Sequence, residues 1–310
     1  MSRRGWALFA AMSVIWGIPY LLIKVADEGV AVPVLVFART AIGAAVLLPL
    51  AVHRRELRVL LPHWRWLAVF AIVEIAGPWL LLSDAERHLT SSMSGLLIAT
   101  VPIIGAVLAR LTGDSERLTL VRWAGLLTGL AGVALLVGQA AGGSAWPVCE
   151  VFLTALGYAT GPLIANRKLA ELPRTGMTAS CLGFTALLYL PAAVVTWPDT
   201  MPTARVLASL AVLAVVCTAL AFILFFRLIA EVGPARATVI TYVNPAVAVA
   251  LGAGLLGEPF TLLIAVAFVL ILSGSVLATR APRRDPAGPG QRQPVARAEA
   301  PPPGEPAQHP

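Results

Sequence analysis

Residues 100–136 read TVPIIGAVLARLTGDSERLTLVRWAGLLTGLAGVALL, two apolar runs joined by a short polar turn. Residues 242–278 repeat this layout as YVNPAVAVALGAGLLGEPFTLLIAVAFVLILSGSVLA. Pro102 of the first stretch corresponds to Pro245 of the second, at an offset of 245 − 102 = 143 residues. An internal repeat of this kind indicates that the chain contains two copies of one structural unit.

The composition indicates a membrane protein. The 310-residue chain is 58% hydrophobic and 13% charged, whereas about 25% of the residues in a typical soluble domain are charged. Long uncharged stretches recur along the chain, each near the roughly 20 residues that cross a bilayer core. We therefore expect an all-α polytopic membrane protein.

The apolar stretches predict ten transmembrane helices. They cover residues 5–24, 33–52, 65–84, 89–110, 119–138, 146–168, 177–197, 204–227, 235–256 and 260–279. Pro19 and Pro162 are also 162 − 19 = 143 residues apart, so each copy holds five helices. Because five is odd, the second copy must enter the membrane from the opposite side, which gives the inverted repeats common in secondary transporters.

Three regions follow from this interpretation. Residues 1–141 form the first five-helix repeat, and residues 142–280 form the inverted second repeat. Residues 281–310 are rich in Pro and Arg and almost free of apolar side chains. We expect this tail to be disordered and cytoplasmic.

The distribution of basic residues predicts the orientation. Nineteen Lys and Arg residues fall in loops on the side of the N-terminus, and three fall on the other side: Lys24, Arg87 and Arg205. Cytoplasmic loops carry this excess, so we expect both termini on the cytoplasmic side of the cell (plasma or inner) membrane. The net charge of +7 is explained by these loops, and we expect no nucleic-acid partner.

The residue types that carry catalysis or bind metal are poorly represented. The three cysteines and four histidines show no metal-ligand spacing, and the predicted spans contain no histidine. We therefore expect no metal, no cofactor and no catalytic residues. An intramembrane enzyme would need a zinc motif, paired aspartates or a nucleophilic serine motif, and none is present in the sequence.

The order of several short motifs resembles the EamA type of the drug/metabolite transporter (DMT) superfamily. The motifs are Trp16-Gly17, Lys24, Phe37-Ala38-Arg39, Pro102, Glu116-Arg117-Leu118-Thr119, Pro245 and Gly257-Glu258-Pro259, and the resemblance covers about residues 5–279. It implies a basket of helices around a central cavity and export or uptake of small metabolites, without an ATP site. Leu182 stands where the second copy would repeat Arg39, so the role of Arg39 does not carry over.

Charged residues inside predicted spans are the first candidates for substrate contact, because burying charge in a bilayer is costly. Arg39 lies ~9 Å and Glu74 ~14 Å from the outer ends of their helices, at 1.5 Å per residue. We expect the two to pair, either as a cavity-lining site for a zwitterionic or anionic substrate or as a structural ion pair. Glu74 is also a candidate proton carrier. Glu150, one turn into its helix, is expected to extend to the outer interface.

Polar and aromatic residues complete the candidate site. Tyr242 and Asn244 precede Pro245, which frees backbone carbonyls within a span, and we expect them to face substrate. Trp16, Trp79, Tyr158 and Tyr189 are candidate aromatic liners of the cavity.

Two glutamates are assigned a structural role. Glu116 and Glu258 correspond at an offset of 258 − 116 = 142, each at the start of a helix. Acids at that position complement the helix dipole, so we interpret both as turn-closing residues.

The sequence therefore favours a secondary transporter, most simply an exporter of small polar, amino-acid-like metabolites or drugs, with proton coupling as an option. Its partners would be a small-molecule substrate and the lipid bilayer. A lipid or glycolipid flippase on the same fold is the alternative, which a large lateral opening would favour.

Overall fold

The computed structural model describes residues 2–112, 120–140, 145–233 and 237–279. Every secondary-structure element in these ranges is helical. Two expectations lie outside them, the role of Glu116 in its turn and the disorder of residues 281–310.

The first half of the chain begins with a broken helix. Helix α1 (Arg3–Ile15) and helix α2 (Pro19–Ala26) are separated at Trp16-Gly17-Ile18, because Pro19 has no N–H to continue the ladder. The other elements of this half are α3 (Val32–His53), α4 (Leu57–Leu60), η1 (Leu61–His63), α5 (Trp64–Phe70), η2 (Ala71–Ala76), α6 (Gly77–Glu86), α7 (Ser91–Ile98), α8 (Val101–Leu111) and α9 (Leu120–Ala140).

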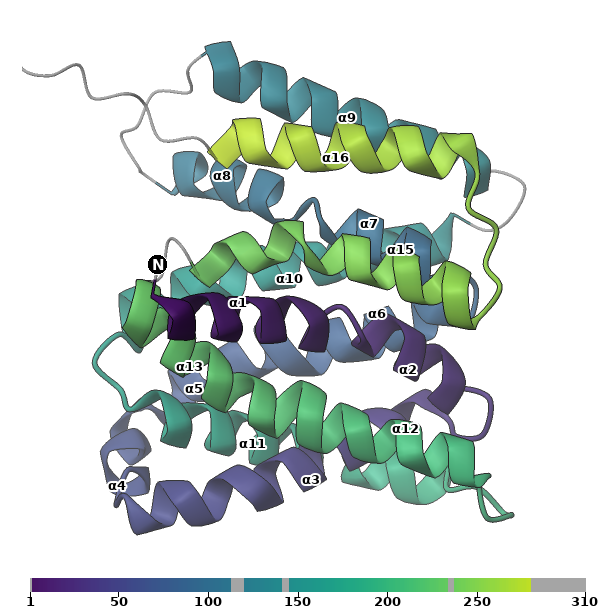
Figure 1. Ribbon diagram of the computed structural model, residues 1–310. Helices are drawn as coiled ribbons and strands as arrows, with labels where there is room; N and C mark the ends of the chain where they lie inside the picture. Colours follow the sequence, from purple (N-terminus) through teal and green to yellow (C-terminus); the bar gives the residue numbers. More distant parts are fainter. Residues whose placement is uncertain (1, 113–119, 141–144, 234–236, 280–310) are drawn as a thin grey trace, which may run out of the picture. The chain divides into compact units, whose positions relative to one another are not determined.

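The second half of the chain is also built of helices, which Figure 1 labels. Its elements are α10 (Trp146–Lys168), α11 (Arg174–Val195), α12 (Ala204–Ala214), η3 (Val215–Leu220), α13 (Ala221–Val232), η4 (Thr238–Tyr242), α15 (Asn244–Leu255) and α16 (Leu262–Thr279).

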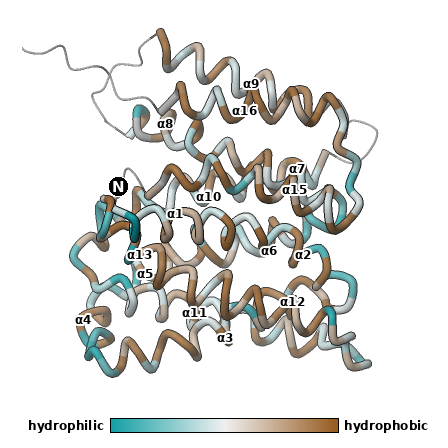
Figure 2. Tube along the Cα trace, viewed as in Figure 1, coloured by the Kyte–Doolittle hydropathy of each residue, from teal (hydrophilic) through white to brown (hydrophobic). Residues whose placement is uncertain are grey.

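Seven helical stretches in the described residues are long and apolar enough to cross a membrane. They are Arg3–Ala26, Val32–His53, Leu57–Glu86, Ser91–Leu108, Trp146–Lys168, Arg174–Val195 and Ala204–Val232, with shorter apolar helices at Trp123–Val137, Val239–Leu255 and Leu262–Leu277. Figure 2 shows hydrophobic residues along the helices and hydrophilic residues gathered at their ends. The prediction of an all-helical polytopic membrane protein is confirmed, and the number of ten spans stays a prediction.

Helices of the first half pack against helices of the second half. The pairs with the most extensive contact are α9 with α16, α3 with α11, α6 with α10, α7 with α15, and α2 with α12. The α9–α16 pair is unusually close, because a Cβ atom added to Gly274 would collide with the backbone of Gly129. Small residues at such contacts let helix backbones approach within a membrane.

Two helices contain a π-helical segment near the middle of a predicted span. Segments η2 and η3 begin at positions 215 − 71 = 144 apart, so they are close to equivalent in the two halves. The hydroxyl of Thr218 donates to the carbonyl of Leu213, at 2.8 Å, which satisfies a group freed by the wider turn. Such π-segments inside α-helices are frequent at functional sites, and Glu74 and Thr218 are each the fourth residue of their segment.

Candidate functional site

The side chain of Arg39 is held by an aromatic ring and a hydroxyl group. Arg39 lies on α3 and is 6% exposed. Its guanidinium carbon lies 3.6 Å from the centroid of the Trp79 ring on α6, and its Nε donates to Thr218 Oγ1 of η3 at 3.0 Å. Stacking on Trp79 is a cation–π interaction, which gains strength away from water. Among the residues that the structure describes, this buried charge has no acidic partner within 4.0 Å.

The predicted ion pair between Arg39 and Glu74 is wrong. No ion pair within 4.0 Å joins these two residues, both of which the structure describes. The Glu74 carboxylate packs instead against α10, where a Cβ atom added to Gly161 would overlap it. The two residues lie at similar depth, but depth does not fix the direction in which a side chain leaves its helix.

The carboxylate of Glu74 has an unsatisfied oxygen. Its Oε2 atom is buried and has no hydrogen-bond partner in the structure. A buried carboxylate oxygen without a partner costs free energy, so this atom is a candidate to accept a proton or a donor group of a ligand.

Tyr158 lies within electrostatic range of both charges. It lies on α10 and interacts electrostatically with both Arg39 and Glu74. We call Arg39, Glu74, Trp79, Tyr158 and Thr218 the central polar cluster. Its members come from α3, η2, α6, α10 and η3. The cluster therefore joins both halves of the chain and includes both π-segments.

The other candidate residues lie at helix breaks. The amide nitrogen of Asn244, in the orientation that satisfies its surroundings, donates to the carbonyls of Ser13 at 3.1 Å and Ile240 at 2.9 Å. These contacts stabilise carbonyls at the α1 break and in η4. The hydroxyl of Tyr242 donates to the carbonyl of Ser275 on α16, at 3.3 Å.

Trp16 packs on aromatic residues of α13. Its ring centroid lies 4.7 Å from that of Phe225 and 6.1 Å from that of Phe222. Of the predicted site residues, the structure brings together Arg39, Glu74 and Tyr158. It places Trp16 in a separate apolar cluster with Met12, Leu228 and Ile240.

Two polar residues near the end of α6 were not recognised as partners from the sequence. The Nζ of Lys24 donates to the carbonyl of Glu86 at 2.8 Å and also to the carbonyl of Leu89. It therefore stabilises the C-terminal end of α6, as basic residues do there. Glu86 is fully buried and interacts with Lys24. Glu86 falls between the predicted spans 65–84 and 89–110, so its burial was not expected.

Glu258 has a structural role that differs from the predicted one. Its carboxylate accepts hydrogen bonds from Ser91 N at 2.6 Å, Ser92 N at 3.0 Å and Ser92 Oγ at 2.6 Å. It caps the N-terminus of α7, in the other half of the chain. Helix α16, which follows Glu258 in the chain, is capped by Thr261 instead. The Oγ1 atom of Thr261 accepts a hydrogen bond from Ile264 N at 3.3 Å.

The expectation that Glu150 extends to the outer interface is also wrong. Glu150 is 3% exposed, and it interacts with Asp84 and Trp146. Because α10 packs closely on α6, the side chain is enclosed between the two helices.

Comparison with known proteins identifies relatives that match most of the chain. The sequence profile of the EamA-like transporter family matches residues 3–138 and again residues 145–280. The uncharacterized inner membrane transporter YedA of Escherichia coli (strain K12) is 28% identical over 291 residues, covering 91% of this chain and 92% of that protein. A Streptantibioticus cattleyicolor protein named as a probable terminal-alkyne amino-acid exporter is 29% identical over 310 residues, covering 94% of this chain and 99% of its own.

One solved structure supports the fold. A crystal structure of a protein that is 24% identical aligns with a TM-score of 0.62 over 90% of this chain and 97% of its own. At this level of identity the likeness concerns the fold alone.

Proposed function

Because this chain belongs to the EamA-like transporter family, within the drug/metabolite transporter superfamily, we propose that it exports small amino-acid-like metabolites by secondary active transport. The family and the names of the relatives indicate a membrane transporter rather than an enzyme. The observation that carries the substrate class is the central polar cluster, which holds two opposite charges apart inside the helices.

The two ends of the cluster suit the two charges of an amino acid. Thr218 occupies one of the five N–H donors of the Arg39 guanidinium. The others would bind the substrate carboxylate, a group that arginine binds in bidentate fashion. The unsatisfied oxygen of Glu74 would accept a hydrogen bond from the substrate ammonium group. Binding would then pair two buried charges that are costly when unpaired.

Glu74 also gives a route to proton coupling. A carboxylate in a span that accepts either a proton or the substrate ammonium can couple the two movements, since the two occupants exclude one another. Export of substrate would then be driven by proton entry. Acidic residues within spans serve as proton relays in pumps and transporters.

We also propose that the fold consists of ten spans in two inverted five-helix repeats around a central cavity, with both termini cytoplasmic. Three observations support this: the family profile matches twice, the π-segments fall at near-equivalent positions, and helices pair across the halves. Reporter fusions at Ser144 and after Arg280 should report opposite sides of the membrane. The same side for both would refute the topology.

Transport by the purified protein tests the function. Proteoliposomes loaded with a mixture of labelled amino acids would be assayed with and without an imposed pH gradient. We expect Arg39→Gln to lower transport about 10- to 100-fold, the equivalent of losing a charged hydrogen bond of about 1.5–3 kcal/mol. Glu74→Gln should abolish the response to the pH gradient while substrate binding persists.

Matched controls come from an exposed ion pair. Arg205 Nη1 lies 3.9 Å from Glu28 Oε2, with both side chains more than half exposed. Arg205→Gln and Glu28→Gln remove the same charges and should leave transport unchanged. Wild-type transport by Arg39→Gln would refute the assigned substrate site. If a labelled phospholipid crosses the bilayer and no amino acid does, the flippase alternative holds instead.

A further inference from the structure

The loop after α3 contains an arginine in an unfavourable backbone conformation. Arg55 has φ = 56° and is the one non-glycine residue with positive φ in the part of the chain that the structure describes. Its N–H donates to the carbonyl of Val52 at 2.9 Å, and the next N–H, of Glu56, donates to the carbonyl of Ala51 at 3.0 Å. This is the helix-ending motif in which glycine is the usual residue. The Cβ atom of a non-glycine residue disfavours this backbone conformation. We therefore looked for a function that requires the arginine side chain at this position.

Arg55 faces a surface pocket. The pocket has a volume of about 500 Å³ and is lined by Val52, Arg55, Leu57 and Arg58. The guanidinium groups of Arg55 and Arg58 therefore line the pocket together with two apolar side chains. Among the described residues, neither guanidinium has a hydrogen bond or an ion pair. We call this site the α3–α4 pocket.

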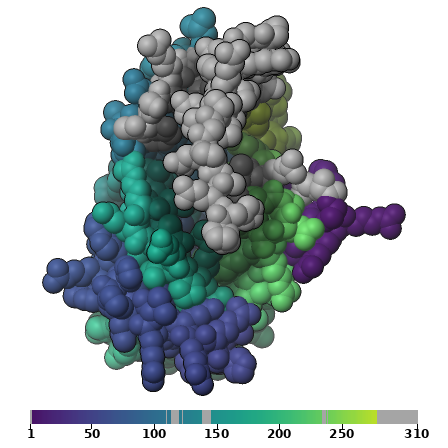
Figure 3. Space-filling view, turned by 90° about the vertical axis from the view of Figure 1, so that its left-hand side faces the viewer, coloured from purple at the N-terminus to yellow at the C-terminus, as the bar shows by residue number. Residues whose placement is uncertain are grey.

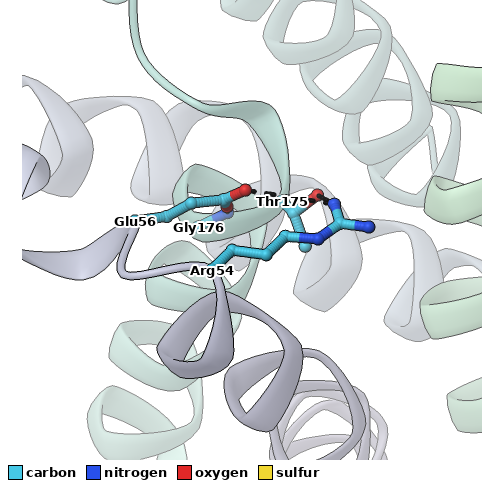
Figure 4. Close-up of polar contacts among 4 residues, drawn as sticks. All are labelled: Arg54, Glu56, Thr175 and Gly176. Carbon is cyan, nitrogen blue, oxygen red and sulfur yellow. Dashed lines mark hydrogen bonds and ion pairs between the residues drawn. The ribbon is translucent and has the colours of Figure 1, made fainter.

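The acidic residue of this loop is already engaged elsewhere. Glu56 Oε2 accepts a hydrogen bond from Gly176 N, at 2.6 Å, at the N-terminus of α11. Arg54 lies 4.0 Å from Glu56 and donates to Thr175 Oγ1 at 3.4 Å. Figure 4 shows both side chains directed toward Thr175 and Gly176. Glu56 is therefore engaged with Arg54, and within the described part of the chain the charges of Arg55 and Arg58 have no acidic partner.

The surroundings of the pocket have the character of a membrane interface. Val59, Leu61 and Trp64 follow Arg58 in the chain and are 55%, 71% and 61% exposed. Exposed tryptophan and aliphatic residues beside arginines are typical of segments that lie at the level of lipid headgroups. Figure 3 shows this region, in blue, at the lower part of the face formed by one end of the helices.

We propose that the α3–α4 pocket binds the phosphate headgroup of an anionic phospholipid. The two guanidinium groups complement a phosphate, since arginine donates bidentate hydrogen bonds to that group. Val52 and Leu57 would contact the glycerol and the start of the acyl chains, and basic clusters next to spans attract anionic lipid. The unfavourable backbone conformation of Arg55 is then explained by the position of its guanidinium group next to the headgroup. This site is separate from the central polar cluster and does not depend on which substrate is carried.

The test measures the thermal stability of the purified full-length protein in neutral detergent. Phosphatidylglycerol, phosphatidylcholine or inorganic phosphate would be added in separate arms. We expect phosphatidylglycerol to raise the Tm of the wild type more than phosphatidylcholine does, because a ligand that binds the folded state stabilises it. Inorganic phosphate at the same concentration should have no effect, since it lacks the apolar contacts.

Arg55→Gly separates a ligand role from a structural one. Glycine suits φ = 56° better than arginine does, so the variant should have the same Tm as the wild type without lipid, or a higher one. It should nevertheless lose the extra increment from phosphatidylglycerol. Arg58→Gln should lose the increment as well. Arg227→Gln, which removes an exposed charge on α13, should keep it.

Three outcomes would overturn the proposal. The first is that Arg55→Gly keeps the full increment from phosphatidylglycerol. The second is that Arg227→Gln loses as much of it, which would indicate a general effect of charge. The third is that inorganic phosphate reproduces it, which would assign the pocket to free phosphate.

Discussion

Replacing Glu258 by alanine should measure how strongly one half of the chain caps a helix of the other. The carboxylate accepts two backbone N–H groups of α7, from Ser91 at 2.6 Å and Ser92 at 3.0 Å. Hydrogen bonds to a charged group are worth about 1.5–3 kcal/mol each. Thr90 Oγ1 still caps Met93 N at 3.1 Å, and water can reach part of the site. We therefore expect Glu258→Ala to lower the free energy of unfolding by about 2–4 kcal/mol, above the ~1 kcal/mol of an ordinary N-cap.

Two further variants make the measurement specific. Glu258→Gln keeps one carbonyl oxygen but loses the charge, so its effect should be about half as large. Glu28→Ala also removes one acid, from the exposed ion pair with Arg205. Exposed ion pairs are worth about 0–1 kcal/mol, so this control should stay within about 0.5 kcal/mol of the wild type.

Unfolding would be followed by circular dichroism and tryptophan fluorescence, in detergent micelles with increasing denaturing detergent. Equal midpoints for Glu258→Ala and Glu28→Ala would refute the reasoning, because the cap on α7 would then contribute nothing beyond a surface charge. A loss of helix content without a shift in midpoint would indicate local fraying of α7 instead.

Three other predictions follow. Burial raises the pKa of Asp27 to about 7; Arg87 opposes this shift and Asp84 reinforces it. Because the folded pKa lies above the unfolded one, the stabilisation is full below about pH 4 and is lost as the pH rises through about 7. The Tm of the wild type should therefore fall between about pH 4 and 7 more than that of Asp27→Asn. Gly161→Ala should displace the Glu74 carboxylate that packs against it and lower transport in proteoliposomes, whereas alanine at a helical glycine with open space around it, Gly183, should not. Deleting residues 285–310, which offer few apolar side chains to bury, should leave both membrane insertion and transport unchanged.

Long-range regularity made much of the fold predictable. Uncharged stretches of span length indicated the helices, and the correspondence of Pro102 with Pro245 indicated the repeat. Pro19 indicated the break between α1 and α2. Each signal acts locally, through the length of an apolar stretch or the missing N–H of proline.

The site was less predictable, because it depends on which way side chains point. Arg39 and Glu74 lie at similar depths in their predicted spans, which suggested a pair. The packing of α3 against α6 sets Arg39 on the Trp79 ring, and the packing of α10 encloses Glu74. The π-segment around Thr218 has no signature in residue periodicity. It shifts side-chain directions within a helix, and without it the partner of Arg39 could not be identified.

The pairing of α9 with α16 has a consequence for synthesis on the ribosome. The last residue of α16 is made 279 − 140 = 139 residues after the end of α9. At about 5–20 residues per second, this is a wait of roughly 7–28 s. During that time α9 lacks the helix whose Gly274 packs against its Gly129. A translation pause or truncation before α16 would thus leave an inserted chain with an unmatched small-residue surface, open to association with a second unfinished chain.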